Sequence, residues 1–157
     1  MSGSMLTAKQ VQELFKLQPL EPEGGYFAET FRSPLSSAIY YMLTPETFSE
    51  LHRLPTDEVF HFYLGGPVRM LQLFPDGAAL EVVIGADILA GERPQVVVPA
   101  GVWQGSRVEP GAAFALLGAT MAPGFDYADY EEGRRSELIG LYPDHARQIE
   151  RLTRSCK

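Results

Sequence analysis

Residues 52–65, HRLPTDEVFHFYLG, combine polar side chains, a strand pattern and a glycine turn. His52 and Glu58 open a strand of aromatic and β-branched residues that ends at Gly65. Such residues are typical of strands that pack on at least one face. The pattern predicts a strand that directs polar groups into the mouth of a small β-barrel.

Residues 99–104, PAGVWQ, form a second informative segment. Pro99 and Gly101 favour a turn, because proline fixes φ and glycine accepts positive φ. Gln104 then enters the next strand as a polar side chain. We expect His52, Glu58 and Gln104 to converge inside one enclosed hollow.

The rest of the chain repeats this pattern, with short strand-like runs separated by turns roughly every 8 to 12 residues, which predicts an all-β sandwich or barrel. The turns at residues 75–77 and 109–111 have the Pro and Gly of hairpin connections. The expected strands are Tyr26–Arg32, Ala38–Leu43, Glu58–Leu64, Arg69–Phe74, Leu80–Ile84, Gln95–Val98, Gln104–Val108 and Ala113–Thr120.

Short helices are expected at both ends of the chain. Thr7 and Gln10 have the capping-box spacing, so a helix should begin near Ala8 and end before Pro19. A last helix should start at Pro143. The length predicts a single domain over residues 5–157, with residues 1–4 as a cloning remnant.

Composition excludes several classes of function. The chain has 157 residues, 45% of them hydrophobic and 21% charged, and no apolar run approaches the roughly 18 residues of a membrane span. A formal charge of −7 leaves no basic stripe for nucleic acid. The lone Cys156 allows no internal disulfide, which fits a reducing cytoplasm.

The first segment resembles the first motif of the cupin superfamily, a pair of histidines followed by a glutamate and then a glycine. Glu58 and Gly65 match the end of the motif, His52 matches its first histidine, and Leu54 occupies the second histidine position.

The segment at Pro99 and Gly101 resembles the second cupin motif, with Gln104 in place of histidine. The closer resemblance is to the family Cupin_5, through residues 22–27, 57–62, 99–104 and 122–125. It implies a cupin-type double-stranded β-helix, or jelly-roll barrel, that is commonly a homodimer. Its shape would be similar to germins and sugar epimerases, with a ligand-sized cavity and no established reaction.

We expect a cupin that binds a small molecule, a sugar-like or carbonyl-bearing metabolite, with epimerase- or isomerase-like chemistry. His52 and Glu58 are the catalytic candidates, because histidine is a general base near neutral pH and a carboxylate such as Asp57 can assist it. A non-catalytic ligand sensor or carrier is an alternative.

Arg32, Gln104, Trp103 and Phe125 are the ligand-binding candidates. Trp103 and Phe125 each adjoin a Pro-Gly turn at the barrel rim, although packing in the core explains them equally well. Arg32 lies three residues after Glu29 in a family-like segment, and a solvated surface position is its alternative.

A divalent metal is a further alternative, with His52, Glu58 and Gln104 as weak ligands of an oxygenase or isomerase. Leucine at position 54 removes an imidazole donor, and glutamine offers only a neutral amide oxygen. The sequence therefore favours a metal-free polar pocket. Strand alternation turns His61 away from the barrel interior if Glu58 points inward, unless a bulge separates them.

Overall fold

The computed structural model describes residues 5–155. The predicted remnant at residues 1–4 and Cys156, for which no internal disulfide is expected, lie outside the described residues. The helices are α1 (Ala8–Leu14), α2 (Arg135–Leu141) and α3 (Ala146–Arg151), with the short 3-10 turns η1 (Ile88–Ala90), η2 (Tyr127–Asp129) and η3 (Pro143–His145). The strands are β1 (Gln18–Pro19), β2 (Tyr26–Arg32), β3 (Ser37–Leu43), β4 (Ser49–Arg53), β5 (Glu58–Gly65), β6 (Val68–Leu73), β7 (Ala79–Ile84), β8 (Gln95–Val98), β9 (Trp103–Val108), β10 (Ala115–Met121) and β11 (Glu131–Glu132).

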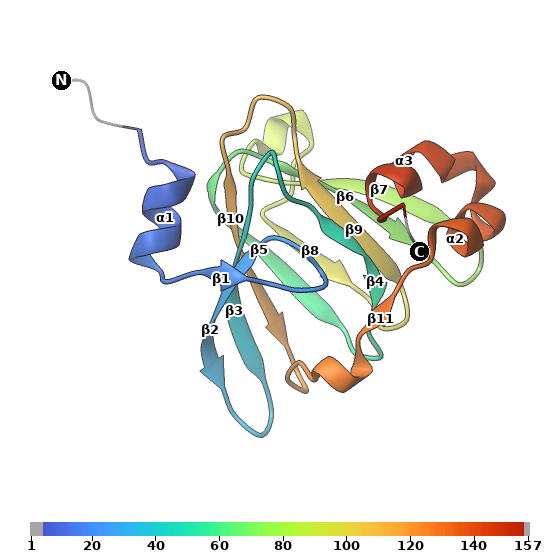
Figure 1. Ribbon diagram of the computed structural model, residues 1–157, viewed down its shortest axis with the longest axis horizontal. Coiled ribbons are helices and arrows are strands. Elements are labelled where there is room, and N and C mark those ends of the chain that lie inside the picture. The colour runs from blue at the N-terminus through green and yellow to red at the C-terminus, as the bar shows by residue number, and fades with distance from the viewer. Residues whose placement is uncertain (1–4, 156–157) are drawn as a thin grey trace.

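Two antiparallel sheets pack face to face and confirm the predicted jelly-roll barrel (Figure 1). Sheet A has the order β1-β2-β3-β10-β5-β8, and sheet B has the order β11-β4-β9-β6-β7. Their inner faces enclose an apolar core that includes Tyr41, Phe60, Met70 and Leu117. All eight expected strands are present. The last of them begins two residues later than expected, because Ala112 still belongs to the turn and donates its N–H to the carbonyl of Glu109.

Residues 52–65 form two strands rather than the single expected one. β4 ends at Arg53, β5 begins at Glu58, and the two strands belong to different sheets. Residues 99–104 hold the turn between β4 and β5 through two hydrogen bonds. Leu54 O accepts the Gly101 N–H at 2.8 Å, and the Asp57 carboxylate accepts the Ala100 N–H at 2.8 Å. His52 and Glu58 therefore enter the interior from opposite sheets.

The helices cover opposite sides of the barrel (Figure 1). α1 has the predicted capping box between Thr7 and Gln10, and its buried Val11 packs with Met42 and Leu116 on sheet A. The predicted last helix is split into η3 and α3, and α2 was not predicted. Leu138 of α2 and Ile149 of α3 pack on the outer face of sheet B.

Within residues 5–155, no helix combines the length and the apolar character needed to cross a bilayer.

Candidate functional site

Glu58 and Gln104 meet between the two sheets, as the sequence predicts. Glu58 on β5 is 8% exposed and Gln104 on β9 is 2% exposed. Gln104 Nε2 donates a hydrogen bond of 2.7 Å to Glu58 Oε1. His52 lies opposite Gln104 in the pairing of β4 with β9 and is also buried. The three predicted side chains therefore belong to one buried polar cluster.

A second carboxylate, which the sequence did not single out, completes this cluster. Glu23 lies in the loop between β1 and β2, and its Oε1 is 3.5 Å from His52 Nε2. The same oxygen accepts a hydrogen bond of 2.9 Å from Ser49 Oγ. The site thus contains two pairs: Glu23 with His52, and Glu58 with Gln104.

The loop that presents Glu23 is held tightly against the end of the barrel. The backbone carbonyl of Glu23 accepts the Glu50 N–H at 2.8 Å, and Tyr41 donates its hydroxyl to the Gly24 carbonyl at 2.6 Å. Gly24 has φ of +103°, and a Cβ at this position would overlap the Phe48 carbonyl oxygen. Only glycine meets both demands, so Gly24 fixes the direction in which Glu23 enters the site.

The tautomer of His52 follows from its backbone partner. His52 Nδ1 is 2.6 Å from the Glu50 carbonyl oxygen, which can only accept, so Nδ1 bears the proton. In the neutral ring, Nε2 then presents its lone pair to Glu23. Tyr130 stacks on the imidazole at 5.0 Å and donates its hydroxyl to the Glu50 carboxylate, which also pairs with Arg154. These contacts fix the ring orientation.

Burial controls the ionisation of the cluster. It raises the pKa of Glu23 to about 7, against the opposing hydrogen bond from Ser49. It also raises the pKa of Glu58 to about 7, and the charge of Glu23 adds to this rise. Burial lowers the pKa of His52. Because the carboxyls interact, their titration belongs to the pair, and at neutral pH one can be ionised while the other is protonated.

The two carboxyls face a cavity of about 60 Å³. Its walls are mainly apolar and come from β2, β3 and β10. The lining consists of Leu20, Glu23, Phe27, Glu29, Ser37, Ile39, Glu58, Ala119, Met121 and Phe125. His52 and Gln104 do not line the cavity, so Glu23 and Glu58 are the members of the buried polar cluster that can touch a ligand.

Arg32 and Phe125 are in direct contact, but only Phe125 lines the cavity. Arg32 Nη2 donates to the Phe125 carbonyl at 2.9 Å, and its guanidinium also binds the Glu29 carboxylate. The Phe125 ring lines the cavity, while Arg32 is 46% exposed. Arg32 therefore ties the segment after β10 to β2 rather than offering an unpaired cation to the interior.

Trp103 lies outside the barrel. On β9 it alternates with Gln104, and it packs with the cluster beneath α2 and α3, where Arg53 lies 4.5 Å above its ring. Asp57, the expected assistant of His52, binds the Ala100 amide instead. His61 points outward, with Nε2 2.9 Å from Thr120 Oγ1, as alternation from Glu58 predicts.

The residues present do not fit the metal that the cupin motifs imply. Gln104 turns its amide N–H group, which binds no metal, toward Glu58. His52 retains a single donor nitrogen, Nε2, because its Nδ1 bonds to the Glu50 carbonyl. In the part of the chain from residue 5 to residue 155, no group of three or more His, Cys, Asp or Glu side chains is arranged to hold an ion. The presence of a metal is a separate question for elemental analysis.

The fold and the site define a small jelly-roll protein with a mainly apolar cavity that two carboxyls face. A family model described as Cupin superfamily (DUF985), Cupin_5, matches residues 9–132. The chain belongs to this family, as its two motif segments predict.

Three relatives match most of this chain, one by sequence and two by structure as well. Uncharacterized protein YML079W of Saccharomyces cerevisiae is 30% identical over 81% of this chain and 77% of its own length. A hypothetical protein from Leishmania major has a TM-score of 0.88 at 31% identity, covering 94% of this chain and 99% of that chain. Protein SO0799 from Shewanella oneidensis has a TM-score of 0.89 at 32% identity, and the match covers 96% of this chain and 99% of that chain.

A more distant likeness supports the fold alone. Oxalate decarboxylase of Bacillus subtilis has a TM-score of 0.60 at 16% identity, covering 88% of this chain and 38% of that chain. At this identity the decarboxylase does not define the chemistry of the present site.

Proposed function

We propose that this protein catalyses proton transfer next to the carbonyl group of a small, uncharged metabolite, as an isomerase or epimerase does. The observation that supports the proposal is the pair of carboxyls, Glu23 and Glu58. Both face one cavity, and burial raises the pKa of each to about 7. A general acid and a general base work best when their pKa lies near the operating pH.

Each carboxyl has a partner that suits one role. Glu23 is the proposed base, because His52 Nε2 faces it and can share the proton that it takes up. Glu58 is the proposed acid, because the Gln104 amide N–H holds one of its oxygens and leaves the other for a substrate. His52 and Gln104 are then positioning residues, since neither lines the cavity.

The proposed step conserves atoms and charge. Ionised Glu23 removes a proton from the carbon next to the carbonyl, and the electron pair of that C–H bond moves toward the carbonyl oxygen. Protonated Glu58 donates its proton to this oxygen, which gives a neutral enol. In the second half, Glu23 returns a proton to carbon while a hydroxyl of the enol gives its proton back to Glu58, so both carboxyls regain their starting states. Protonation of the same carbon on its opposite face, with loss of the proton on the former carbonyl oxygen, completes an epimerisation. Protonation of the former carbonyl carbon, with loss of the proton of a hydroxyl on the neighbouring carbon, completes an isomerisation. The low polarity of the cavity strengthens both interactions.

The cavity also indicates the class of substrate. Among the described residues that line it, the charged side chains are the carboxylates Glu23, Glu29 and Glu58, which repel an anionic substrate. Phe27, Ile39 and Met121 give apolar walls. A volume of about 60 Å³ accommodates only a few non-hydrogen atoms beside the carboxyls. These features favour a short hydroxy-aldehyde, hydroxy-ketone or similar compound over a nucleotide sugar.

Incorporation of deuterium from solvent tests the proposal. Short hydroxy-carbonyl compounds are incubated with the protein in D2O, and loss of the proton signal next to the carbonyl is followed by NMR. Glu23→Gln and Glu58→Gln should each lower the exchange rate at least about 100-fold, the range of general acid or base catalysis. Glu46→Gln, at an exposed carboxylate outside the cavity, is the control and should exchange at the wild-type rate.

The other outcomes favour different functions. Saturable binding of these compounds without exchange would point to a sensor or carrier. Exchange that appears only after a divalent metal is added, with close to one ion bound per chain, would favour a metal-dependent enzyme. Exchange that is unchanged in both cavity variants would contradict the assigned roles of Glu23 and Glu58.

A further inference from the structure

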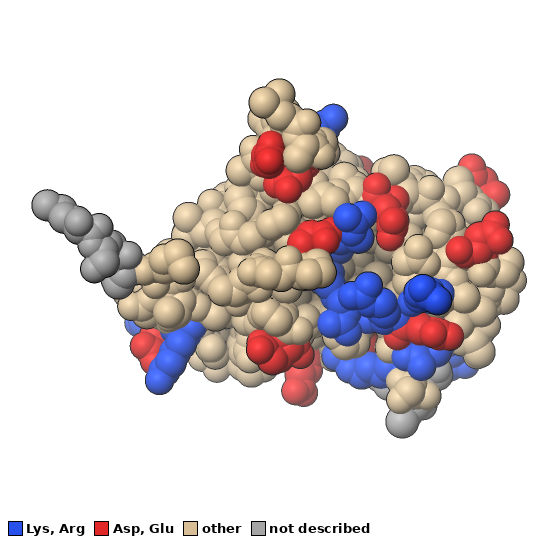
Figure 2. Space-filling view, turned by 90° about the horizontal axis from the view of Figure 1, so that it is seen from above, with Lys and Arg blue, Asp and Glu red and all other residues tan. Residues whose placement is uncertain are grey.

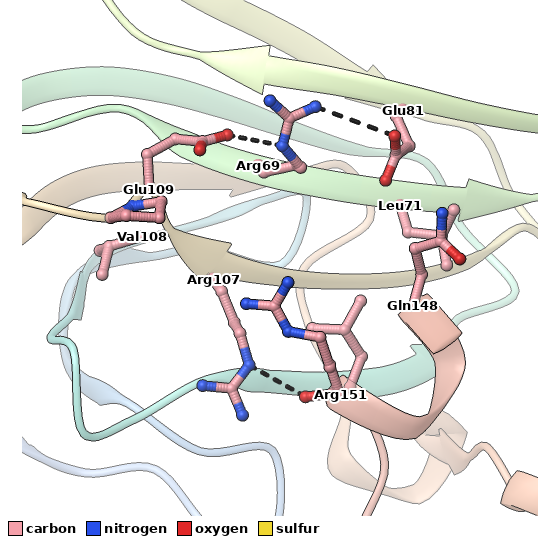
Figure 3. Close-up of a pocket in the computed structure, with 10 residues that line it drawn as sticks. Arg69, Leu71, Glu81, Arg107, Val108, Glu109, Gln148 and Arg151 are labelled. Atoms are coloured by element: carbon pink, nitrogen blue, oxygen red, sulfur yellow. Dashed lines mark hydrogen bonds and ion pairs between the residues drawn. The ribbon is translucent and has the colours of Figure 1, made fainter. Parts of the chain in front are cut away.

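A second pocket, of about 150 Å³, lies on the outer face of sheet B beside α3. Figure 3 shows it between β6, β9 and the last turns of α3. Its lining combines three arginines, two glutamates, a glutamine and four less polar residues: Arg69, Arg107, Arg151, Glu81, Glu109, Gln148, Leu71, Val108, Pro110 and Leu152. It is separate from the interior cavity, because Arg107 and Gln104 lie on opposite faces of β9.

Arg69 forms ion pairs with both carboxylates of this pocket, Glu81 and Glu109. Its Nε lies 2.6 Å from Glu109 Oε1, and its Nη1 lies 3.8 Å from Glu81 Oε2. Within residues 5–155, neither Arg107 nor Arg151 forms an ion pair with a carboxylate. Arg107 and Arg151 thus have no direct carboxylate partner in this part of the chain, and the three arginines and two glutamates of the lining leave the pocket a net charge of +1.

The fold holds Arg107 close to Arg151. Arg107 Nε donates 2.9 Å to the backbone carbonyl of Arg151, at the C-terminal end of α3. Its guanidinium also lies 4.3 Å above the Phe48 ring. Burial lowers the pKa of Arg107, and the positive charge of Arg151 lowers it further. The two like charges are thus near enough to repel, and an anion between them would relieve that repulsion.

Arg151 and Gln148 provide donors that point into the pocket. Figure 3 shows the Arg151 guanidinium reaching from α3 toward Arg107, and the Gln148 side chain on the other side of the pocket, near Leu71 and Glu81. Arg151 and Gln148 are three apart on α3, so they share one helix face. A guanidinium presents a planar set of N–H donors that matches a carboxylate or a phosphate.

Other basic side chains lie on the surface around this pocket. Lys and Arg side chains gather on the side of the molecule that includes the C-terminal helices (Figure 2). Arg154 also lies beside the Phe48 ring, but its guanidinium is paired with the Glu50 carboxylate.

We propose that this outer pocket binds a small organic anion through Arg151, Arg107 and Gln148. The anionic head would be a carboxylate or a phosphate, which share the geometry that guanidinium groups recognise. Leu71, Pro110 and Leu152 form apolar walls for the body of the ligand. The site is independent of the proposed proton transfer, since none of its residues lines the interior cavity.

Isothermal titration calorimetry with inorganic phosphate and with butyrate tests this site, at constant ionic strength maintained with sodium chloride. The wild-type chain should bind at least one of the two anions at one site per chain. Arg151→Gln should weaken binding roughly tenfold or more, because it removes a charge-assisted hydrogen bond. Its fold should persist, since Arg107 binds the backbone carbonyl of residue 151 rather than its side chain.

Arg147→Gln is the matched control, because Arg147 is an exposed arginine on the same helix and lies outside the pocket lining. It should bind like the wild type. Tighter binding of phosphate would indicate a phosphate ester as ligand, and tighter binding of butyrate would indicate a carboxylate. In amide NMR spectra, the added anion should shift residues 107, 148 and 151.

Three results would overturn the proposal. They are a wild-type Kd weaker than about 10 mM for both anions, equal affinity in the wild type and Arg151→Gln, or amide shifts centred on Glu58 and Gln104. None of these results bears on deuterium exchange in the interior cavity, so the two proposals can fail separately.

Discussion

Glu23 and Glu58 are carboxyl groups whose ionisation is opposed by the interior in which they lie. Each has a pKa near 4.5 in an unfolded chain and of about 7 in the folded protein. Between these values the folded state binds more protons than the unfolded state, so the free energy of unfolding falls as the pH rises. The stability linked to these groups is fully present below about pH 4.5 and is lost as the pH rises through 7. His52, with its lowered pKa, has the opposite dependence.

Glu58→Gln should remove part of this pH dependence. The amide cannot ionise, so the variant avoids the unfavourable buried charge at high pH. We expect its stability relative to the wild type to be greater at about pH 8 than at about pH 5. Urea unfolding at the two pH values measures this difference. If Glu58→Gln changes the free energy of unfolding by the same amount at about pH 5 and at about pH 8, then Glu58 ionises in the folded protein as it does in the unfolded chain.

Among the residues of the buried polar cluster, the sequence identified His52, Glu58 and Gln104 but not Glu23. Glu58 and Gln104 could be predicted to meet, because two turn motifs place each at the start of a strand. Glu23 could not, since it lies in a loop that pairing rules do not position. The one available signal was the Gly24-Gly25 pair after it, which indicates a tight turn that aims the preceding side chain.

At the scale of elements, the loop between β1 and β2 controls the site. It crosses the end of the barrel and bonds to β4 through the Glu50 N–H and to β3 through the Tyr41 hydroxyl. β4 was missed in the sequence because Pro55 interrupts residues 52–65 and the strand has only five residues. Its polar composition also lacks the β-branched residues that mark a strand.

Gly24→Ala should displace this loop. Its Cβ would overlap the Phe48 backbone, which cannot rotate away, and the positive φ adds strain. We expect a loss of more than about 1 kcal/mol in unfolding free energy, together with loss of deuterium exchange as Glu23 moves away from His52. Gly77→Ala is the matched control, because Gly77 has φ of +91° and a methyl group added there would meet no atom within 4 Å. Equal effects in the two variants would mean that the close approach to Phe48 is unimportant.

At the scale of the whole molecule, the outer face of sheet A has an apolar row that crosses five strands. The row runs through cross-strand neighbours on β2, β3, β10, β5 and β8, which are Phe31, Ala38, Thr120, Val59 and Val97. Phe31 is 54% exposed and Val97 is 51% exposed. A face of this kind is a candidate for burial in an oligomer. We propose that it forms the homodimer interface that the cupin resemblance predicts.

Light scattering tests this assembly. The wild type should have twice the mass of one chain, and Val97→Glu should have the mass of one chain, because a dimer would bury the new charge. Leu89→Glu is the control, since Leu89 is fully exposed on η1, away from the row. A monomeric wild type, or a dimeric Val97→Glu, would contradict the proposal.

The general fold could be predicted because strand alternation and turn chemistry are local properties of the sequence. α2 was missed because its apolar face is short. Leu138 is its buried residue, and its helical structure depends on packing against sheet B.

The central claim is that two carboxyls in the interior cavity share protons near neutral pH. A 13C NMR titration of the glutamate side-chain carboxyl carbons, with signals assigned through Glu23→Gln and Glu58→Gln, measures this directly. We predict that the two signals titrate as a coupled pair around pH 7, well above the ordinary range of a glutamate. Midpoints near 4.5 for both groups would contradict the claim.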